Sequence, residues 1–337
     1  MSASGSVSAG ADSRLVADIG GTNARFALLS EQGELYHERV LACADYPGLV
    51  AAIEAYLDTA PAAQPRQAIL AVATATVSDT ISLTNHAWSF SIAETRARLG
   101  FERLSCINDF TALALSLPHL SATELRQIGG GSAKPASAIA LLGAGTGLGV
   151  SGLLYTPQGW FPLQGEGGHI SYGPLSAREQ AVWTVINRRT GHVSAERLLS
   201  GQGLVNIYQA LRELDDPAAD DLQQPALITE RGLQDQCVLC AETLALFCAA
   251  LGTVAGNLAL TLGAQGGVYI GGGIVPRLGT YFDSSAFRHR FEQRGRFTAY
   301  LQTIPVYIIT AATPALRGAA QAFDPFYADI GWSSRAC

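Results

Sequence analysis

The chain has 337 residues, of which 48% are hydrophobic and 15% are charged, so it is long enough for two domains with buried cores and too apolar for a disordered protein. Its net charge is −6 and it has no basic tract, which argues against nucleic acid as a partner. Lys134 is the one lysine, which argues against a P-loop, a Schiff base and a protein-kinase phosphate clamp, since each needs a lysine.

The first half of the chain begins with a small, polar segment over residues 1–13. It lacks the apolar core of a secretory signal, so we expect a disordered tail on a protein of a reducing compartment. Apolar periodicity then predicts strands over residues 15–29 (a hairpin), 68–74, 80–83 and 104–107, and helices over 46–57, 91–99 and 110–117.

The pattern restarts at residue 139, after a glycine-rich linker predicted over residues 121–137. Strands are predicted over residues 139–154, 160–161, 268–270 and 306–309, and helices over 176–188, 242–262 and 314–323. This alternation of helices and strands indicates an α/β protein.

Two features of the second half have alternative interpretations. Residues 243–276 carry no charge, which would suit a membrane span, but Asn257, Gln265 and several glycines favour a buried helix followed by a strand. Cys237 and Cys240 could be a redox or zinc pair, but no second ligand pair stands at a suitable spacing. We therefore expect buried free thiols.

Two glycine-rich turns, each between predicted strands, carry most of the functional information. Glycine lets the backbone take positive φ and approach a ligand closely, and successive N–H groups form a concavity that binds anions. We interpret the turns as two halves of one polyphosphate site; the alternative is a pair of tight hairpins without a ligand. The residues are Asp18, Ile19, Gly20, Gly21, Thr22 and Asn23 in the first turn, and Gly145, Thr146 and Gly147 in the second.

Carboxylates stand beside two predicted strand ends of the first half. Asp18 would repel phosphate unless a cation such as Mg²⁺ lay between them; the alternative is that it stabilises the turn. Asn108 and Asp109 lie where a strand ends and a helix begins. Asp109 is either the N-cap of that helix or a general base that deprotonates an acceptor hydroxyl.

Polar residues of the second half suit a polyhydroxylated ligand. Glu166 and His169 flank two glycines, so they do not form a helical metal motif, and they can accept and donate hydrogen bonds to hydroxyls. The alternative is a salt bridge within the loop. Glu196 either belongs to the same site or complements a helix dipole. Gly271 and Gly272 form a third turn where a ligand can approach.

Together these motifs resemble a known family. From about residue 15 to residue 323, the chain closely resembles the bacterial glucokinases of the proteobacterial type, within the hexokinase/actin-like ATPase superfamily. The motifs that carry the resemblance are Asp18–Arg25, Thr84–Trp88, Ile107–Phe110, Gly143–Gly149, Gly165–His169, Gly191–Arg197 and Gly272–Pro276.

The resemblance implies ATP-dependent phosphorylation of D-glucose to glucose 6-phosphate, the first step of glycolysis, with Mg²⁺. It implies Asp109 as catalytic base, a sugar site at Asn108, Asp109, Glu166, His169 and Glu196, and a nucleotide site at the three turns, with Asp18 holding Mg²⁺ through water. The implied fold is two RNase H-like α/β lobes with a cleft between them. The implied domains are residues 14–119, joined by a C-terminal helix over residues 311–330, and residues 120–310. A cytoplasmic homodimer that binds no nucleic acid or membrane is also implied.

Two rival functions remain open. A related hexose kinase would act on mannose or an N-acetylhexosamine; the repressor/open-reading-frame/kinase family carries a cysteine-rich zinc motif after the Glu-Gly-Gly-His segment, and residues 170–188 contain no cysteine. A non-catalytic sugar sensor or an actin-like ATPase is the other rival. An ATPase would turn over without sugar, and a repressor-type sensor would need a DNA-binding helix pair, for which residues 1–12 are too short.

Overall fold

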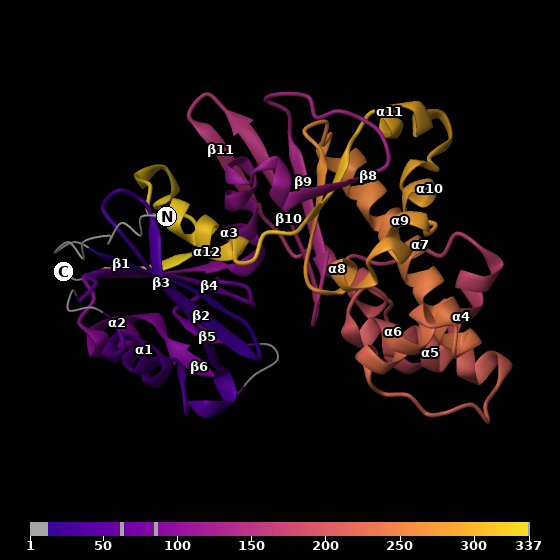
Figure 1. Cartoon of the computed structure of the whole chain (residues 1–337), viewed down its shortest axis with the longest axis horizontal. Coiled ribbons are helices and arrows are strands. Elements are labelled where there is room, and N and C mark those ends of the chain that lie inside the picture. Colours follow the sequence, from indigo (N-terminus) through magenta and orange to yellow (C-terminus); the bar gives the residue numbers. More distant parts are fainter. Residues whose placement is uncertain (1–12, 61–63, 84–86, 336–337) are drawn as a thin grey trace, which may run out of the picture. The chain divides into compact units, whose positions relative to one another are not determined.

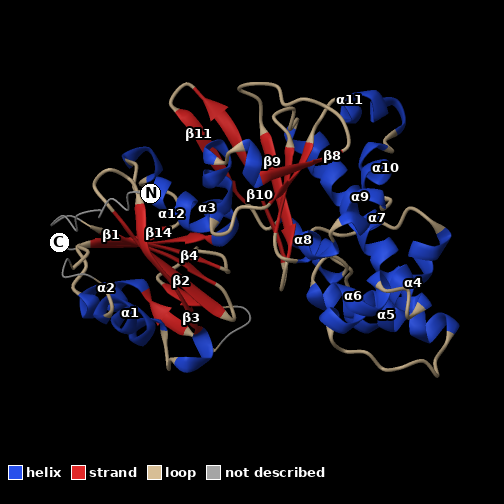
Figure 2. Cartoon of the chain, in the orientation of Figure 1, coloured by secondary structure: helices blue, strands red, loops and turns tan. Residues whose placement is uncertain are grey.

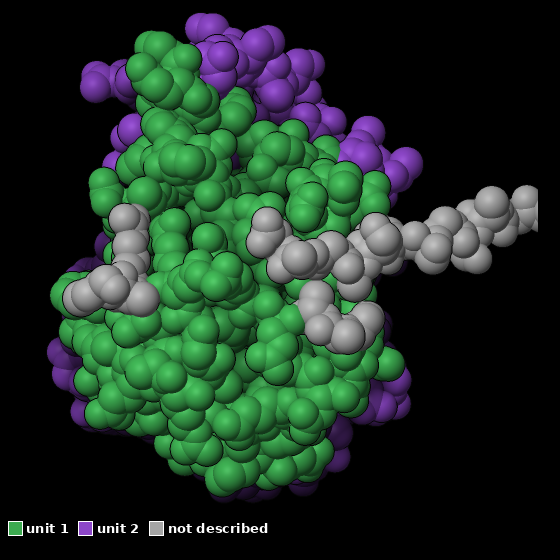
Figure 3. Space-filling model, turned by 90° about the vertical axis from the view of Figure 1, so that its left-hand side faces the viewer, with its two compact units in different colours: residues 1–120, 156–164, 311–337 green, residues 121–155, 165–310 purple. Residues whose placement is uncertain are grey.

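The computed structural model describes residues 13–60, 64–83 and 87–335, which form two compact units. Unit 1 comprises Met1–Leu120, Thr156–Gln164 and Ala311–Cys337, and unit 2 comprises Ser121–Tyr155 and Gly165–Thr310 (Figure 3). The tail expected over residues 1–13 lies, except for Ser13, outside the described residues. Residues 156–164 group with unit 1, whereas the predicted boundaries place them in the second domain. The predicted domain boundaries therefore stay a prediction.

Unit 1 is built on a six-stranded sheet with the order β14-β7-β4-β1-β2-β3 (Figure 1). The first glycine-rich turn joins β1 to β2 as an antiparallel hairpin, as predicted, and β1, β4 and β7 run parallel. The carboxyl ends of these three strands therefore meet at one edge of the sheet. The strands are β1 (Arg14–Ile19), β2 (Asn23–Leu29), β3 (Leu35–Ala42), β4 (Gln67–Val72), β7 (Arg103–Asn108) and β14 (Trp332–Arg335), and the hairpin β5 (Thr80–Ser82) and β6 (Ser89–Ser91) lies outside the sheet.

Helices cover both faces of this sheet (Figure 2). Successive strand residues face opposite sides, so Leu15 and Ala17 pack with α1 (Leu49–Asp58) and α2 (Ile92–Leu99), while Val16 packs with α3 and α12. Helix α3 (Asp109–Ser116) and helix α12 (Pro314–Gln321) approach closely because Gly318 has no side chain. A Cβ at Gly318 would lie 1.6 Å from the carbonyl oxygen of Ala112.

Unit 2 contains five of the six strands of the second sheet, in the order β10-β9-β12-β13-β8. The second glycine-rich turn joins β9 (Ile139–Ala144) to β10 (Leu148–Thr156) as an antiparallel pair, and β9 runs parallel to β12 (Val268–Gly271), which runs parallel to β13 (Val306–Ile309). Strand β11 (Gly159–Gln164), which follows β10 in the chain, is grouped with unit 1.

Helix α7 (Val238–Leu262) is the central helix of unit 2. It packs against α5 (Gly201–Asp215), α6 (Pro225–Leu233) and α10 (Phe287–Glu292). By length and hydropathy α7 could cross a membrane, but 67% of its most apolar window is buried inside the protein, which is typical of a core helix. The predicted buried helix is thus confirmed. The other helices of this unit are α4 (Ala177–Thr190), α8 (Ile274–Leu278), α9 (Thr280–Ser284) and α11 (Thr298–Gln302).

Several local predictions are wrong. The supposed linker over residues 121–137 contains a 3₁₀ turn and the strand β8 (Leu125–Ile128), which pairs with β13. A helix dipole near Glu196 is not that of an α-helix, because residues 195–197 form the 3₁₀ turn Ala195–Arg197 and the next α-helix begins at Gly201. Cys237, Cys240 and Cys248 are free thiols as expected, although Cys237 is only half-buried. Among the described residues no group of three or more potential ligands could hold a metal ion.

Candidate active site

The first glycine-rich turn lies at the edge where the parallel strands of unit 1 end. The backbone N–H of Gly20 donates to the carbonyl of Asn23 at 3.0 Å, and that of Cys43 donates to the carbonyl of Thr22 at 2.9 Å. These bonds fix the turn and leave the Thr22 side chain exposed. Neither Gly20 nor Gly21 has a positive φ, so the turn is open to a ligand through the lack of side chains and not through left-handed backbone.

Asp18 lies at the start of this turn and is paired with Arg25, for which the sequence motifs predict no separate role. In the β1–β2 register Asp18 stands opposite Arg25, whose Nη1 donates to its Oδ2 at 3.2 Å. Burial raises the pKa of Asp18 above its ordinary value, and the Arg25 charge opposes that rise. The hairpin spacing was the available signal for this pair. Ile19 pairs with Ala24 across the four residues 20–23, and this register sets Asp18 opposite Arg25.

Asn108 ends β7 and Asp109 begins α3. The Oδ1 of Asn108 accepts from the N–H groups of Phe110 at 2.9 Å and Thr111 at 3.2 Å, so Asn108 is the N-cap. The alternative that Asp109 is the N-cap is therefore wrong. Asp109 is the first helical residue, is half-buried, and accepts from the N–H of Phe110 at 2.9 Å.

The strand register brings Asn108 to the same edge as the first turn. Asn108 pairs with Val72, and Val72 pairs with Ile19, so the three residues form one row across β7, β4 and β1. With strands about 4.8 Å apart, the Cα atoms of Asn108 and Ile19 are separated by roughly 10 Å. Unit 1 therefore places the predicted base and the first predicted phosphate turn side by side, at the position where α/β sheets bind ligands.

The second glycine-rich turn lies at the corresponding edge of unit 2. The N–H of Gly145 donates to the carbonyl of Gly147 at 2.8 Å, and the carbonyl of Gly145 accepts from Gly201, the first residue of α5, at 2.8 Å. The Thr146 side chain is exposed, as that of Thr22 is. In both turns a backbone hydrogen bond closes the turn and a threonine hydroxyl is accessible.

The third turn lies directly against the second. Gly271 pairs with Gly143, and a Cβ at Gly143 would lie 2.5 Å from the carbonyl carbon of Gly271. Gly272 has a φ of +77°, and a Cβ there would lie 2.3 Å from the carbonyl oxygen of Ala144. Glycine is required here both for the left-handed backbone and for the close approach.

The start of β10 gathers three of the predicted sugar-binding residues. Gly167 and Gly168 pack on it: a Cβ at Gly168 would lie 2.2 Å from the carbonyl oxygen of Leu148. The Oε2 of Glu196 accepts from the N–H of Leu148 at 2.9 Å. Glu196 thus binds backbone of β10 and does not complement an α-helix dipole, so that alternative is wrong.

Glu166 and His169 flank this packed pair of glycines, with their side chains 60% and 63% exposed. The distance from His169 Nε2 to Glu166 Oε2 is 3.9 Å. An exposed contact of this kind stabilises a loop by at most about 1 kcal/mol, even as a full ion pair. Both side chains are therefore available to a ligand.

The comparisons with known proteins agree with one another. The chain matches the sequence model of the family described as Glucokinase over residues 15–325. A glucokinase of Aromatoleum aromaticum is 51% identical over 313 residues, which cover 92% of this chain and 94% of that protein. A glucokinase of Neisseria meningitidis serogroup C is 49% identical over 311 residues, again 92% of this chain and 94% of that protein.

Solved structures show the same relationship. The crystal structure of a glucokinase from an Antarctic psychrotroph has a TM-score of 0.80 at 38% identity and covers 92% of this chain and 98% of that chain. A ROK family glucokinase from Streptomyces griseus, crystallised with glucose and AMPPNP, shares the fold with a TM-score of 0.60 at 18% identity, over 92% of this chain and 98% of that chain. The predicted α/β class is confirmed, and the chain belongs to the glucokinase family.

Proposed function

We propose that this protein transfers the γ-phosphoryl group of ATP to the 6-hydroxyl of D-glucose. Membership of the glucokinase family supports the reaction, and one observation supports its assignment to this site. Asn108, and not Asp109, caps α3. The Asp109 carboxylate follows β7 at the edge where the parallel strands β1, β4 and β7 end, and α/β sheets bind ligands at such an edge. A carboxylate there can take the proton of a sugar hydroxyl as it attacks phosphorus.

The nucleotide in this proposal is bound by backbone groups. The turn over residues 18–23, the turn over residues 145–147, and Gly271 with Gly272 offer N–H groups, exposed threonine hydroxyls and space free of side chains. These turns contain no lysine that could bind the phosphates in place of the backbone N–H groups. Arg25 is the positive charge nearest to the first turn, and it is paired with Asp18.

The donor set at Asp18 fits Mg²⁺. This ion keeps several waters and takes one or two carboxylates plus substrate phosphates, and Asp18 is a single, partly exposed carboxylate next to the turn. When bound, Mg²⁺ neutralises charge on the phosphates. Asp18 would hold it through water.

The sugar in this proposal is bound by Asn108, Asp109, Glu166, His169 and Glu196. Carboxylates and imidazole at these positions can accept from and donate to the hydroxyls of glucose. Exclusion of water would matter, because water competes with the sugar as phosphoryl acceptor. A cytoplasmic homodimer acting at the first step of glycolysis completes the proposal.

A coupled assay with glucose, ATP and Mg²⁺ tests the function, with mannose, fructose and N-acetylglucosamine as parallel acceptors. We expect glucose 6-phosphate to form and glucose to have the highest kcat/KM. Equal or better turnover of mannose or N-acetylglucosamine would contradict the assignment of glucose. ATP hydrolysis at the same rate with and without sugar would contradict kinase activity altogether.

A further inference from the structure

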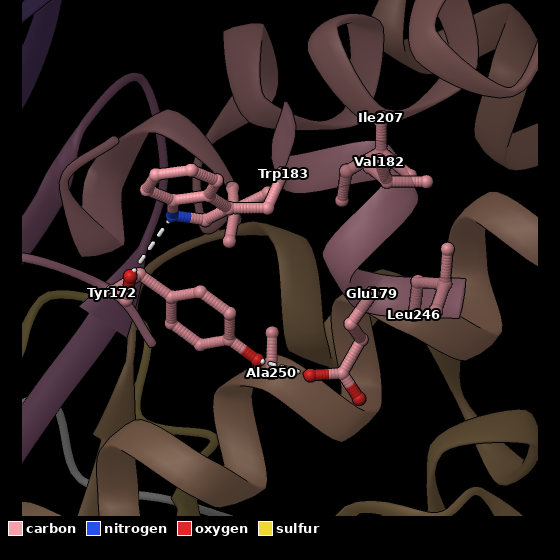
Figure 4. A pocket seen from close by; sticks show the side chains of 8 residues that line it. Tyr172, Glu179, Val182, Trp183, Ile207, Leu246 and Ala250 are labelled. Carbon is pink, nitrogen blue, oxygen red and sulfur yellow. Dashed lines mark hydrogen bonds between the residues drawn. The ribbon is translucent and has the colours of Figure 1, made fainter. Parts of the chain in front are cut away.

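A buried tyrosine stands three residues after His169 and is held by hydrogen bonds at both ends. The hydroxyl of Tyr172 donates to Glu179 Oε2 at 2.9 Å, and the indole N–H of Trp183 donates to the Tyr172 carbonyl at 3.0 Å (Figure 4). Tyr172 is 6% exposed. Its side chain therefore ties the segment that follows Glu166–His169 to helix α4.

Glu179 continues this chain of contacts into the core of unit 2. Its carboxylate also accepts from the N–H of Leu175 at 3.0 Å and from both terminal nitrogens of Arg290, at 2.5 and 3.3 Å. Arg290 in turn donates to Thr253 of α7 at 2.9 Å. The Glu179 and Arg290 side chains are only 6% and 11% exposed. Helices α4, α7 and α10 therefore converge on one buried ion pair.

The position of Arg290 is set by glycines of α7. A Cβ at Gly252 would lie 2.2 Å from the Phe287 carbonyl oxygen, and one at Gly256 would lie 2.7 Å from the Phe291 carbonyl oxygen. Helix α10 thus packs backbone-to-backbone on α7. Buried ion pairs give little net stability compared with apolar packing, so stability alone does not account for a charged pair at this junction.

The Tyr172 ring is buried beside a small cavity. Tyr172, Glu179 and Trp183 line this cavity together with mostly aliphatic side chains (Figure 4). Val182, Ile207, Leu246 and Ala250 are among them. The hydrogen bond from the Tyr172 hydroxyl to Glu179 therefore acts together with packing to fix the position of the ring.

The Tyr172 backbone is directly linked to the predicted sugar site. Its N–H donates to the Val193 carbonyl at 2.9 Å, and the N–H of Ala195 donates to the Ile170 carbonyl at 2.9 Å. Residues 170–172 are thereby paired with residues 193–195, with an isolated bridge between Ser171 and Ser194. His169 precedes one side of this pairing, and Glu196 follows the other.

We propose that Tyr172, Glu179 and Arg290 are positioning residues, which hold His169 and Glu196 at the spacing that binds the sugar. This inference rests on the proposed function. It predicts a selective defect: the sugar should bind more weakly, whereas the nucleotide turns, which these three residues do not contact in any described hydrogen bond, should bind ATP as before. A loss of binding that is equal in the ground and transition states raises KM without lowering kcat.

The test compares Tyr172→Phe with Tyr208→Phe, both assayed beside the wild type. Tyr208 is a matched control because it is a buried tyrosine of unit 2 whose hydroxyl donates to the Asp220 carbonyl at 2.7 Å, away from the 166–172 segment. We expect Tyr172→Phe to raise the KM for glucose about 10- to 100-fold, since small misplacements of binding groups have effects of this order. The KM for ATP and the kcat should change less than about threefold, and Tyr208→Phe should leave all three constants near wild type.

Glu179→Gln gives a second, independent variant. It keeps the shape of the side chain and removes its charge, so it should raise the KM for glucose, as Tyr172→Phe should. The double variant with Tyr172→Phe should be no worse than the more damaged single variant, because both changes break one chain of contacts. Calorimetric titration with glucose measures the same defect without turnover.

The outcomes separate the two proposals. An active wild type with an unchanged glucose KM in Tyr172→Phe, even at a lowered Tm, would overturn the positioning role and leave the glucokinase function intact. Equal rises in the KM for glucose and for ATP would overturn it too, since that pattern indicates general damage. A wild type that forms no glucose 6-phosphate would overturn the proposed function, and the positioning role with it.

Discussion

At the end of β7, two adjacent residues with similar side chains have different roles. Asn108 caps the helix with its amide oxygen, while the Asp109 carboxylate begins the helix beside the first helical N–H. The N-terminus of α3 is a position where a negative charge such as that of Asp109 is stabilising. The division of roles depends on order: an exchange of the two residues would put the carboxylate at the cap.

This arrangement makes a prediction for Asp109→Asn. The amide has the same shape and can keep the contact with Phe110, but it cannot take a proton. We expect kcat to fall at least about 100-fold while ATP still binds, because general base catalysis contributes about 10²- to 10⁴-fold. Steady-state kinetics and a nucleotide titration measure the two effects.

Asp216→Asn is a suitable control for this variant. The Oδ1 of Asp216 also accepts from a nearby backbone N–H, that of Ala218, in an exposed turn. It should keep wild-type turnover. An Asp109→Asn enzyme with near wild-type kcat would rule out Asp109 as the base.

At the scale of elements, the closest packing in unit 1 is between α3 and α12. The two helices are distant in sequence, and α3 carries Asp109 at its first position. Gly318 makes their approach possible, and Leu316 and Ala319 of α12 complete the apolar core behind the sheet. The position of the predicted base therefore depends on a helix formed by the last part of the chain.

Gly318→Ala should be destabilising for this reason. A methyl group would have to lie 1.6 Å from the Ala112 carbonyl oxygen, so α12 must move away from α3. Overpacking of this kind costs about 1–3 kcal/mol of unfolding free energy, and more where backbone blocks relaxation. Denaturation in urea gives the measurement.

Gly201→Ala is the matched substitution in another helix. A Cβ at Gly201 meets no atom closer than 3.4 Å, so this variant should be neutral or stabilised by up to about 1 kcal/mol. If the two variants had equal stability, the close approach of α12 and α3 would not be a constraint on the fold.

At the scale of the whole molecule, unfolding should depend on pH through Glu179. Burial alone would raise the pKa of this carboxyl, but hydrogen bonds from Arg290, the Leu175 N–H and Tyr172 outweigh burial and hold the pKa below its usual value of 4.5. The stabilising contribution is therefore present above pH 4.5 and is lost as the pH falls through the lowered pKa.

Glu179→Gln should be less stable than the wild type at pH 7, by about 3–5 kcal/mol for a broken buried pair. The difference should narrow as the pH falls below 4.5, because the wild type then loses the same interaction. Urea denaturation from pH 7 down to about pH 2 follows the two curves through the range in which Glu179 takes up its proton. Parallel curves would show that Glu179 does not carry this pH dependence.

Glu213→Gln serves as the comparison. Hydrogen bonds from Arg189 and Arg188 lower the pKa of Glu213 as well, but its side chain is 39% exposed. High salt should abolish the small loss of unfolding free energy in Glu213→Gln. The loss in Glu179→Gln should persist, because buried ion pairs are poorly screened.

Local sequence predicted much of the fold and left out what depends on distant partners. The β1–β2 hairpin and α7 follow from continuous apolar runs with glycine at their ends. Strand β8 lies inside the linker that the glycines over residues 129–131 predict. Its four residues are half polar, and only pairing with β13 makes it a strand. Strand β14, Trp-Ser-Ser-Arg, depends in the same way on β7.

In the candidate site, too, local sequence predicts some features, and others depend on residues distant in the chain. Its residue types could be predicted from motifs, since Asp109, Glu166 and His169 stand beside glycines or strand ends. The bond from Glu196 to the Leu148 N–H spans 48 positions, and the bond from Arg290 to Glu179 spans 111. No local pattern contains such pairs, so the support beneath the site could be found only in three dimensions.

The packing of α12 on α3 has a consequence for the protein while it is being made. The face of the first sheet that includes Val16, Leu29 and Ile69 is completed by Leu316, Phe323 and Ile330, which emerge from the ribosome only after residues 121–310. At about 5–20 residues per second, this interval lasts roughly 10–40 s. During that time the nascent chain carries an apolar surface that lacks its final cover, and a chaperone that binds apolar segments would have its best access to the chain then.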